Sequence, residues 1–176
     1  ALAAKQIEYF DAKPAYLRMC VIEAANGREV VSVERSSQNG EVRVVPVEGL
    51  REVADRDYFA KTLALVNGEH YVSDITPSSD HGIDATETWP SIIVSAPITD
   101  ENGAKLGIFV ITVDMRPYFA QLQDSKSVGA RFYVLNDSGA YVLHPDDMRA
   151  NAPQSSSFVN EFPLLAANAR DEGVRV

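Results

Sequence analysis

The chain has 176 residues, of which 45% are hydrophobic and 9% aromatic, a composition typical of an ordered globular protein. Its 16 basic residues stand against 25 acidic ones, for a formal net charge of −9. This balance argues against nucleic acid as a partner, because phosphate binding needs clustered Lys and Arg. The single cysteine, Cys20, excludes an internal disulfide and is expected to be a small core residue.

The first half of the chain predicts a mixture of helix and strand. Residues 1–13 have the pattern of the end of a helix. Residues 17–35 (LRMCVIEAANGREVVSVER) predict a β-hairpin, because the Asn-Gly pair tolerates the positive φ of a tight turn and the flanks are rich in β-branched residues. Apolar spacing over residues 47–67 predicts one or two amphipathic helices that end at the next Asn-Gly pair. Residues 68–75 (GEHYVSDI) then indicate a strand.

The second half repeats the hairpin pattern. Residues 76–90 are dense in Ser, Thr, Asp, Gly and Pro and predict a loop. Residues 91–114 and 131–145 each have two apolar flanks around a tight-turn sequence and predict two more hairpins. Between them, residues 115–127 predict a short helix that tolerates Pro117 in its first turn.

Strands joined mainly by hairpins, with helices gathered between them, indicate an α+β fold with a central antiparallel sheet. We place a domain boundary near residues 124–129, because the strand–turn–strand unit recurs after it in a second, smaller domain. No run approaches the roughly 20 apolar residues that cross a bilayer, and the N-terminus lacks the features of a signal peptide. Both ends look abrupt, so we expect a piece of a longer protein.

Catalytic and metal-binding patterns are missing from the sequence. It contains no H-E-x-x-H, G-x-S-x-G, P-loop or G-x-G-x-x-G motif. The three histidines, His70, His81 and His144, fall in different segments. We therefore expect no catalytic residue, no metal site and no cofactor.

Two positions are candidates for ligand contact. Asp114 ends a continuously apolar strand, so its carboxylate needs donors or a cation, and it either caps the following helix or contacts a ligand. Arg56 has a fork of donors that suits a carboxylate, and Tyr58 could supply a wall and a hydroxyl. The alternative is a surface ion pair with Asp55 or Asp57, which the residues alone favour.

The order of the segments NGREVVSVER, DRDYF, HYVSDI and SAPITDENGAKLGIFVITVD resembles the membrane-distal half of a double Cache (PDC) sensor domain, whose halves are PAS-like. The resemblance covers about residues 14–120, and residues 132–146 resemble the start of the membrane-proximal half. It implies the end of a long N-terminal helix at 1–13, a distal ligand-binding subdomain at 14–124 and an incomplete proximal subdomain at 125–176.

The resemblance also implies a function. Such domains lie outside the cytoplasmic membrane in bacterial histidine kinases, chemoreceptors or diguanylate cyclases, between flanking transmembrane helices and usually as homodimers. Their distal pocket binds small molecules such as amino acids, carboxylates or amines. In the amino-acid branch an Arg-x-Trp-Tyr stretch binds the ligand carboxylate and an Asp at the end of the last distal strand binds the ammonium. Arg56 and Asp114 match this pattern, whereas Tyr58 and Phe59 replace the Trp and the Tyr.

The remaining family positions complete the expected site. The strand tyrosine and aspartate of that branch fall on Tyr71 and on Ser73 or Asp74, and Trp89 either borders the pocket or belongs to the core. We therefore expect a non-catalytic sensor of a small polar ligand. The alternatives are an interaction or dimerisation module without a ligand and, less favoured, a secreted hydrolase.

Overall fold

The computed structural model of the chain describes residues 2–36, 40–77, 89–124, 132–136, 139, 141–144 and 158–163. The chain forms two compact units, Ala1–Arg116 and Pro117–Val176. The division lies at the start of helix α3 (Arg116–Asp124), whereas the sequence places the boundary at the end of that helix.

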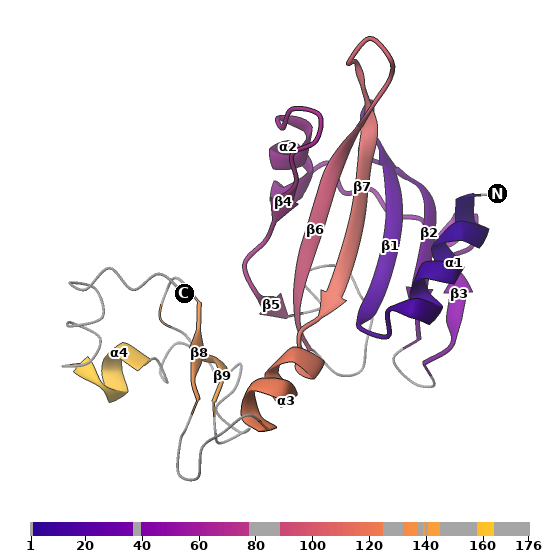
Figure 1. Ribbon diagram of the computed structural model, residues 1–176. Coiled ribbons are helices and arrows are strands. Elements are labelled where there is room, and N and C mark those ends of the chain that lie inside the picture. Colours follow the sequence, from indigo (N-terminus) through magenta and orange to yellow (C-terminus); the bar gives the residue numbers. More distant parts are fainter. Residues whose placement is uncertain are drawn as a thin grey trace. The chain divides into compact units, whose positions relative to one another are not determined.

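The first unit is built on one sheet of seven strands, all antiparallel to their neighbours (Figure 1). The order is β3-β2-β1-β7-β6-β4, and β5 also pairs with β6. The strands are β1 (Tyr16–Glu23), β2 (Glu29–Arg35), β3 (Val42–Val44), β4 (Tyr71–Val72), β5 (Thr76–Pro77), β6 (Pro90–Thr99) and β7 (Lys105–Asp114). The predicted α+β class with a central antiparallel sheet is confirmed.

Local turn chemistry forms both predicted hairpins of this unit. Gly27 joins β1 to β2 with φ of 67°, a conformation that a side chain disfavours. In the β6–β7 turn the Asp100 carboxylate accepts hydrogen bonds from the amides of Asn102 and Ala104, and Gly103 has φ of 83°. The central pair β6–β7 is the longest in the sheet, with ten residues in each strand.

Helices cover the two faces of the sheet. On one face, Phe10 from α1 (Leu2–Ala12) packs with Met19 and Val33. On the other face, a second core cluster joins α2 (Asp57–Leu63) to β1, β6 and β7; its buried members are Cys20, Ile22, Val53, Phe59, Ile93, Ile108 and Val110. Before α2, a single 3₁₀ turn, η1, spans Val47–Gly49.

Helix α2 ends earlier than the sequence predicts. The carbonyl of Leu65 accepts a hydrogen bond from the Lys105 ammonium, and the Leu65 amide reaches back only three residues, to the Thr62 carbonyl at 3.2 Å. Gly68, with φ of 93°, lies in the turn beyond. A contact from a distant strand therefore holds the chain just beyond α2, which ends before the Asn-Gly pair.

Strand β4 is also shorter than predicted. The Ser73 amide still donates to the Ile93 carbonyl at 2.9 Å, but the Ile93 amide donates to the Ser73 hydroxyl oxygen at 2.9 Å. A side chain thus replaces the backbone acceptor, and the regular β4–β6 pairing ends. The same hydroxyl donates to the Asp74 carbonyl at 2.8 Å. Residues 78–88 of the predicted loop, including His81, lie outside the described residues.

The second unit contains most of α3, with Pro117 in its first turn as predicted, and a hairpin of β8 (Val134–Leu135) and β9 (Tyr141–Leu143). This confirms the third predicted hairpin. A short helix, α4 (Phe158–Glu161), which the sequence did not predict, adds to a cluster of rings formed by Tyr133, Tyr141, His144, Phe158 and Phe162. Within the described parts of the chain, no helix is both long enough and apolar enough to cross a membrane.

Candidate functional site

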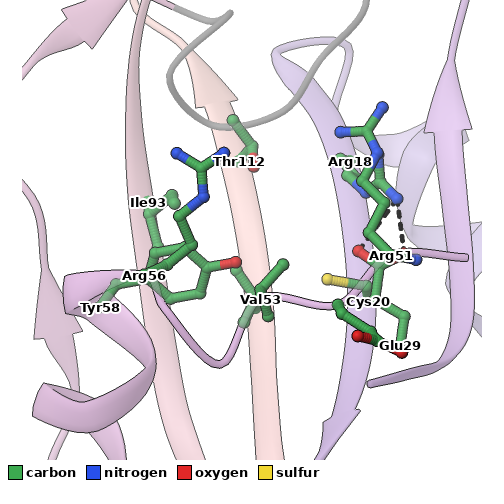
Figure 2. Close-up of a pocket in the computed structure, with 11 residues that line it drawn as sticks. Arg18, Cys20, Glu29, Arg51, Val53, Arg56, Tyr58, Ile93 and Thr112 are labelled. Carbon is green, nitrogen blue, oxygen red and sulfur yellow. Dashed lines mark hydrogen bonds and ion pairs between the residues drawn. The ribbon is translucent and has the colours of Figure 1, made fainter. Parts of the chain in front are cut away.

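A cavity of about 50 Å³ lies on the α2 side of the sheet, which we call the inner cavity. Figure 2 shows Arg56 and Tyr58 at the start of α2 on one side of it, and Arg18, Cys20 and Arg51 on the other. Its described lining residues are Arg18, Cys20, Glu29, Arg51, Glu52, Val53, Arg56, Tyr58, Ile93, Val110 and Thr112.

Strand register brings the floor of this cavity together. Arg18 on β1 lies opposite Thr112 on β7, and Thr112 lies opposite Ile93 on β6. One step along, Cys20 lies opposite Val110. Because side chains alternate between the faces of a strand, these five point to the same face.

The turn of the first hairpin, at Gly27, holds residues 51–56, which form part of the cavity wall. The Val53 amide donates to the Gly27 carbonyl at 2.9 Å, and the Glu29 amide donates to the Arg51 carbonyl at 2.9 Å. A Cβ on Gly27 would lie only 2.6 Å from the Cβ of Ala54. Close backbone approach at this glycine therefore positions the segment that leads directly to Arg56.

A buried ion pair occupies the β1–β2 side of the cavity. Arg18 and Glu29 are 3% and 4% exposed. Nη2 of Arg18 donates to both carboxylate oxygens of Glu29, at 2.9 and 2.7 Å, and Nη1 lies 3.5 Å from a carboxylate oxygen of Glu34. The Arg51 amide also donates to Glu29, at 3.1 Å. Such pairing is what allows two charges to remain buried.

Two weak acids beside this pair remain protonated at neutral pH. Burial raises the pKa of the Cys20 thiol to about 12; the Glu29 carboxylate adds to the rise and Arg18 opposes it. Burial also raises the pKa of the Tyr58 hydroxyl above its usual range, with Cys20 and Glu29 adding to the effect and Arg18 and Arg56 opposing it. The Tyr58 hydroxyl is thus a hydrogen-bond donor at the cavity wall.

A second, more open cavity of about 330 Å³ adjoins the first, and we call it the outer cavity. The two share Arg56, Tyr58 and Ile93. The outer cavity is also lined by Asp55, Asp57, Tyr71 and Ser73. Four of the residues expected from the sequence, Arg56, Tyr58, Tyr71 and Ser73, are therefore brought together.

The surface pair weighed for Arg56 is present but weak. Nε of Arg56 lies 4.0 Å from a carboxylate oxygen of Asp55, and the two side chains are 50% and 83% exposed. Exposed pairs of this kind contribute little to stability. The pair leaves half of the Arg56 side chain accessible from solvent.

The other three expected residues do not line either cavity. Asp114 is buried, and its carboxylate accepts hydrogen bonds from the Arg116 amide at 2.9 Å and from the Arg116 guanidinium at 2.7 and 3.0 Å. Of the two roles considered for Asp114, the structure therefore contains the one at the start of α3, as the hydrogen bond from the Arg116 amide. Trp89 packs against the same guanidinium, and the Asp74 side chain is on the surface, with its carbonyl bonded to the Ser73 hydroxyl.

Sequence reasoning missed most of the inner cavity, notably Arg18, Cys20 as a wall residue, Glu29 and Thr112. One available signal was the arginine inside the apolar run LRMCVI, since a charge in a buried strand needs a partner. The argument that singled out Asp114 applies equally to Arg18. Glu29 had no comparable signal, because its burial depends on which strands become neighbours.

Comparisons with known proteins place this architecture among sensor domains. The model of a family described as "Bacterial histidine kinase, sensor domain" matches residues 12–158. The sequence has no significant match among curated proteins.

Solved structures share the fold. A domain described as from a sensory box/GGDEF family protein of Vibrio parahaemolyticus has a TM-score of 0.75 and 22% identity, covering 94% of this chain and 63% of that one. The extracellular domain of a protein described as the histidine kinase vpHK1S-Z8 has a TM-score of 0.75 and 21% identity, covering 94% and 60%.

The ligand-binding domain of the Pseudomonas aeruginosa PAO1 amino acid chemoreceptor PctC, solved with GABA, has a TM-score of 0.58 and 20% identity, covering 92% and 62%. The chain thus spans 60 to 63% of the length of these structures.

Proposed function

We propose that this chain, which belongs to the bacterial histidine kinase sensor-domain family, binds a small polar ligand in the two adjoining cavities beside α2. The family is a sensory one, so this region is a sensor module outside the cytoplasm rather than a catalytic domain. The full-length receptor would be anchored by flanking transmembrane helices, act as a homodimer and carry a kinase, cyclase or chemoreceptor output.

The two adjoining cavities carry the proposal. The inner part is small and rich in charged groups, whereas the outer part is larger and opens to solvent. Arg56 and Tyr58 line both parts, so one ligand could contact them from either side. Ligand sites commonly combine such concavity with a few oriented polar groups.

The binding residues would be Arg56, Tyr58 and Tyr71, with Ser73 at the outer margin. Arg56 would bind a carboxylate or another acceptor, and Tyr58 would donate a hydrogen bond to it. The Ser73 hydroxyl is bonded to the backbone, so it would act mainly by shaping the wall. The GABA complex of the chemoreceptor with this fold makes amino acids and carboxylates the first ligands to test.

Signalling would follow from the elements that the site connects. The start of α2 lies over β6, and the buried hydroxyls of Thr62 and Ser95 tie helix to strand at 2.6 Å. Strand β1, which contributes Arg18 and Cys20 to the floor of the inner cavity, follows α1 after a short turn, in which the Tyr16 amide donates to the Lys13 carbonyl at 3.0 Å. A ligand that binds one arrangement of α2 and β1 better than another would shift their populations and so move α1.

A thermal-shift screen of amino acids, carboxylates and amines tests the proposal, because a ligand of the folded state raises the melting temperature by mass action. We expect at least one saturable hit that Arg56→Ala removes with little change in the melting temperature of the free protein. Arg28→Ala, at an exposed arginine beside the β1–β2 turn, is the matched control and should keep the response. A silent screen would instead favour a module that only mediates protein interaction.

A further inference from the structure

The buried guanidinium of Arg18 has more donors than its neighbours use. Its Nη2 is taken by Glu29. Its Nε and Nη1 are buried and make no hydrogen bond to any described residue, and Nη1 has only the 3.5 Å ion-pair contact with Glu34. A buried donor without an acceptor costs free energy, and more so when it is charged. These N–H groups therefore need an acceptor.

The inner cavity is the place where such an acceptor can lie, because Arg18 lines it. A cavity of about 50 Å³ has room for a few waters or for one small polar group. Its described lining residues include three arginines and two glutamates, and the Glu34 carboxylate beside Nη1 of Arg18 brings these charges close to balance. A carboxylate would supply the acceptors that the unused N–H groups of Arg18 lack, in the paired geometry that a guanidinium fork prefers.

The outer cavity imposes a different requirement on the rest of the ligand. Asp55 and Asp57 line it, and both side chains are strongly exposed. Asp55 lies 4.0 Å from Arg56 and Asp57 lies 3.5 Å from Lys61, so a second carboxylate at this end of a ligand would compete with both aspartates for these cations, which disfavours it. A neutral or ammonium-bearing end of the ligand would not compete in this way.

From these contacts we infer that Arg18, on β1, is the anion-binding residue of the inner cavity and that the ligand is a monocarboxylate whose other end carries no negative charge. The inference rests on the proposed function and specifies its ligand class. It adds a binding residue from the sheet floor to those at the start of α2. One carboxylate held by both Arg18 and Arg56 would connect β1 to α2.

Titration calorimetry of the 176-residue chain with four probes of equal chain length tests this: butyrate, 4-aminobutyrate, succinate and butylamine. We expect butyrate or 4-aminobutyrate to bind, succinate to bind at least tenfold more weakly, and butylamine not to bind. Arg18→Lys keeps a charge for Glu29 but removes the fork, so it should weaken carboxylate binding by roughly 10- to 100-fold, the worth of one or two charged hydrogen bonds. Arg28→Lys, at an exposed arginine beside the β1–β2 turn, should bind as the wild type does.

The other outcomes separate this inference from the proposed function. If carboxylates bind equally well to Arg18→Lys, or if butylamine alone binds, the inference fails and ligand sensing stands. If none of the four binds, the inference also fails, and the broader screen decides on sensing. Should Arg18→Lys unfold, the Nε–H resonance of Arg18 in the wild-type protein gives a second readout, and its failure to shift on addition of saturating butyrate would overturn the inference.

Discussion

The guanidinium of Arg116 lies 3.6 Å from the centre of the Trp89 ring. The same group holds the Asp114 carboxylate. A cation over an aromatic face is attracted by the ring, so the pair fixes the start of β6 to the end of β7. Trp89 is the only tryptophan of the chain, which makes this contact observable.

Replacing Arg116 should therefore change tryptophan fluorescence. In Arg116→Ala the covered face of the Trp89 ring becomes accessible to water, so we expect emission to shift to longer wavelength and acrylamide to quench it more strongly. The buried Asp114 carboxylate also loses charged donors, which should cost about 1–3 kcal/mol in unfolding free energy. Emission identical to that of wild type would show that the stacking is not maintained in solution.

Removing one member of the Arg18–Glu29 pair should destabilise the fold strongly. Arg18→Met leaves the buried Glu29 carboxylate without its cation, and we expect a loss of about 3–5 kcal/mol. Glu29→Leu leaves Arg18 only the 3.5 Å contact with Glu34, so its loss should be similar or somewhat smaller. The double variant removes both charges and should lose clearly less than the sum of the two. Urea unfolding of the four proteins measures this coupling, and additive losses would contradict the pairing.

Gly27 and Gly68 provide a matched comparison of backbone strain and steric contact. Both have positive φ, but a Cβ at Gly27 would meet the backbone and Cβ of Ala54 at 2.6–2.7 Å, whereas a Cβ at Gly68 meets no atom within 4 Å. Gly68→Ala should cost about 1 kcal/mol from strain alone. Gly27→Ala should cost more and should also weaken ligand binding, because it displaces the segment leading to Arg56. Equal melting temperatures for the two variants would exclude the steric contribution.

Because burial raises the pKa of Cys20, the free energy of unfolding should change with pH in the alkaline range. Between the ordinary thiol value of 9.0 and about 12 the unfolded chain loses the thiol proton while the folded chain keeps it, so the free energy of unfolding falls as pH rises through this window. Below pH 9 both states are protonated and the thiol contributes no slope. The difference in unfolding free energy between wild type and Cys20→Ala should hence shrink from pH 8 to pH 10.5, by about 2 kcal/mol. A difference that does not change with pH would show that the thiol titrates normally.

Local patterns were sufficient to predict much of the fold. The three hairpins, the helix with Pro117 and the antiparallel sheet follow from turn residues and apolar alternation within short windows. The predicted ends of α2 and β4 were wrong, and at both points the chain makes hydrogen bonds to a distant strand, from Lys105 to Leu65 and between Ser73 and Ile93. Element limits depend on contacts that a short window does not contain.

The sequence by itself determined that Arg56 and Tyr58 stand at the start of a helix, and its segment order pointed to a sensor domain. Only the tertiary structure decided which groups they face. Arg18 lies opposite Thr112 because β1 pairs with β7, and Glu29 reaches Arg18 where an irregularity shifts the β1–β2 register beside Ile22. A one-residue change in register moves a side chain to the other face of a sheet, so the charged floor of the cavity is set by pairing between strands distant in sequence and cannot be read from any one of them.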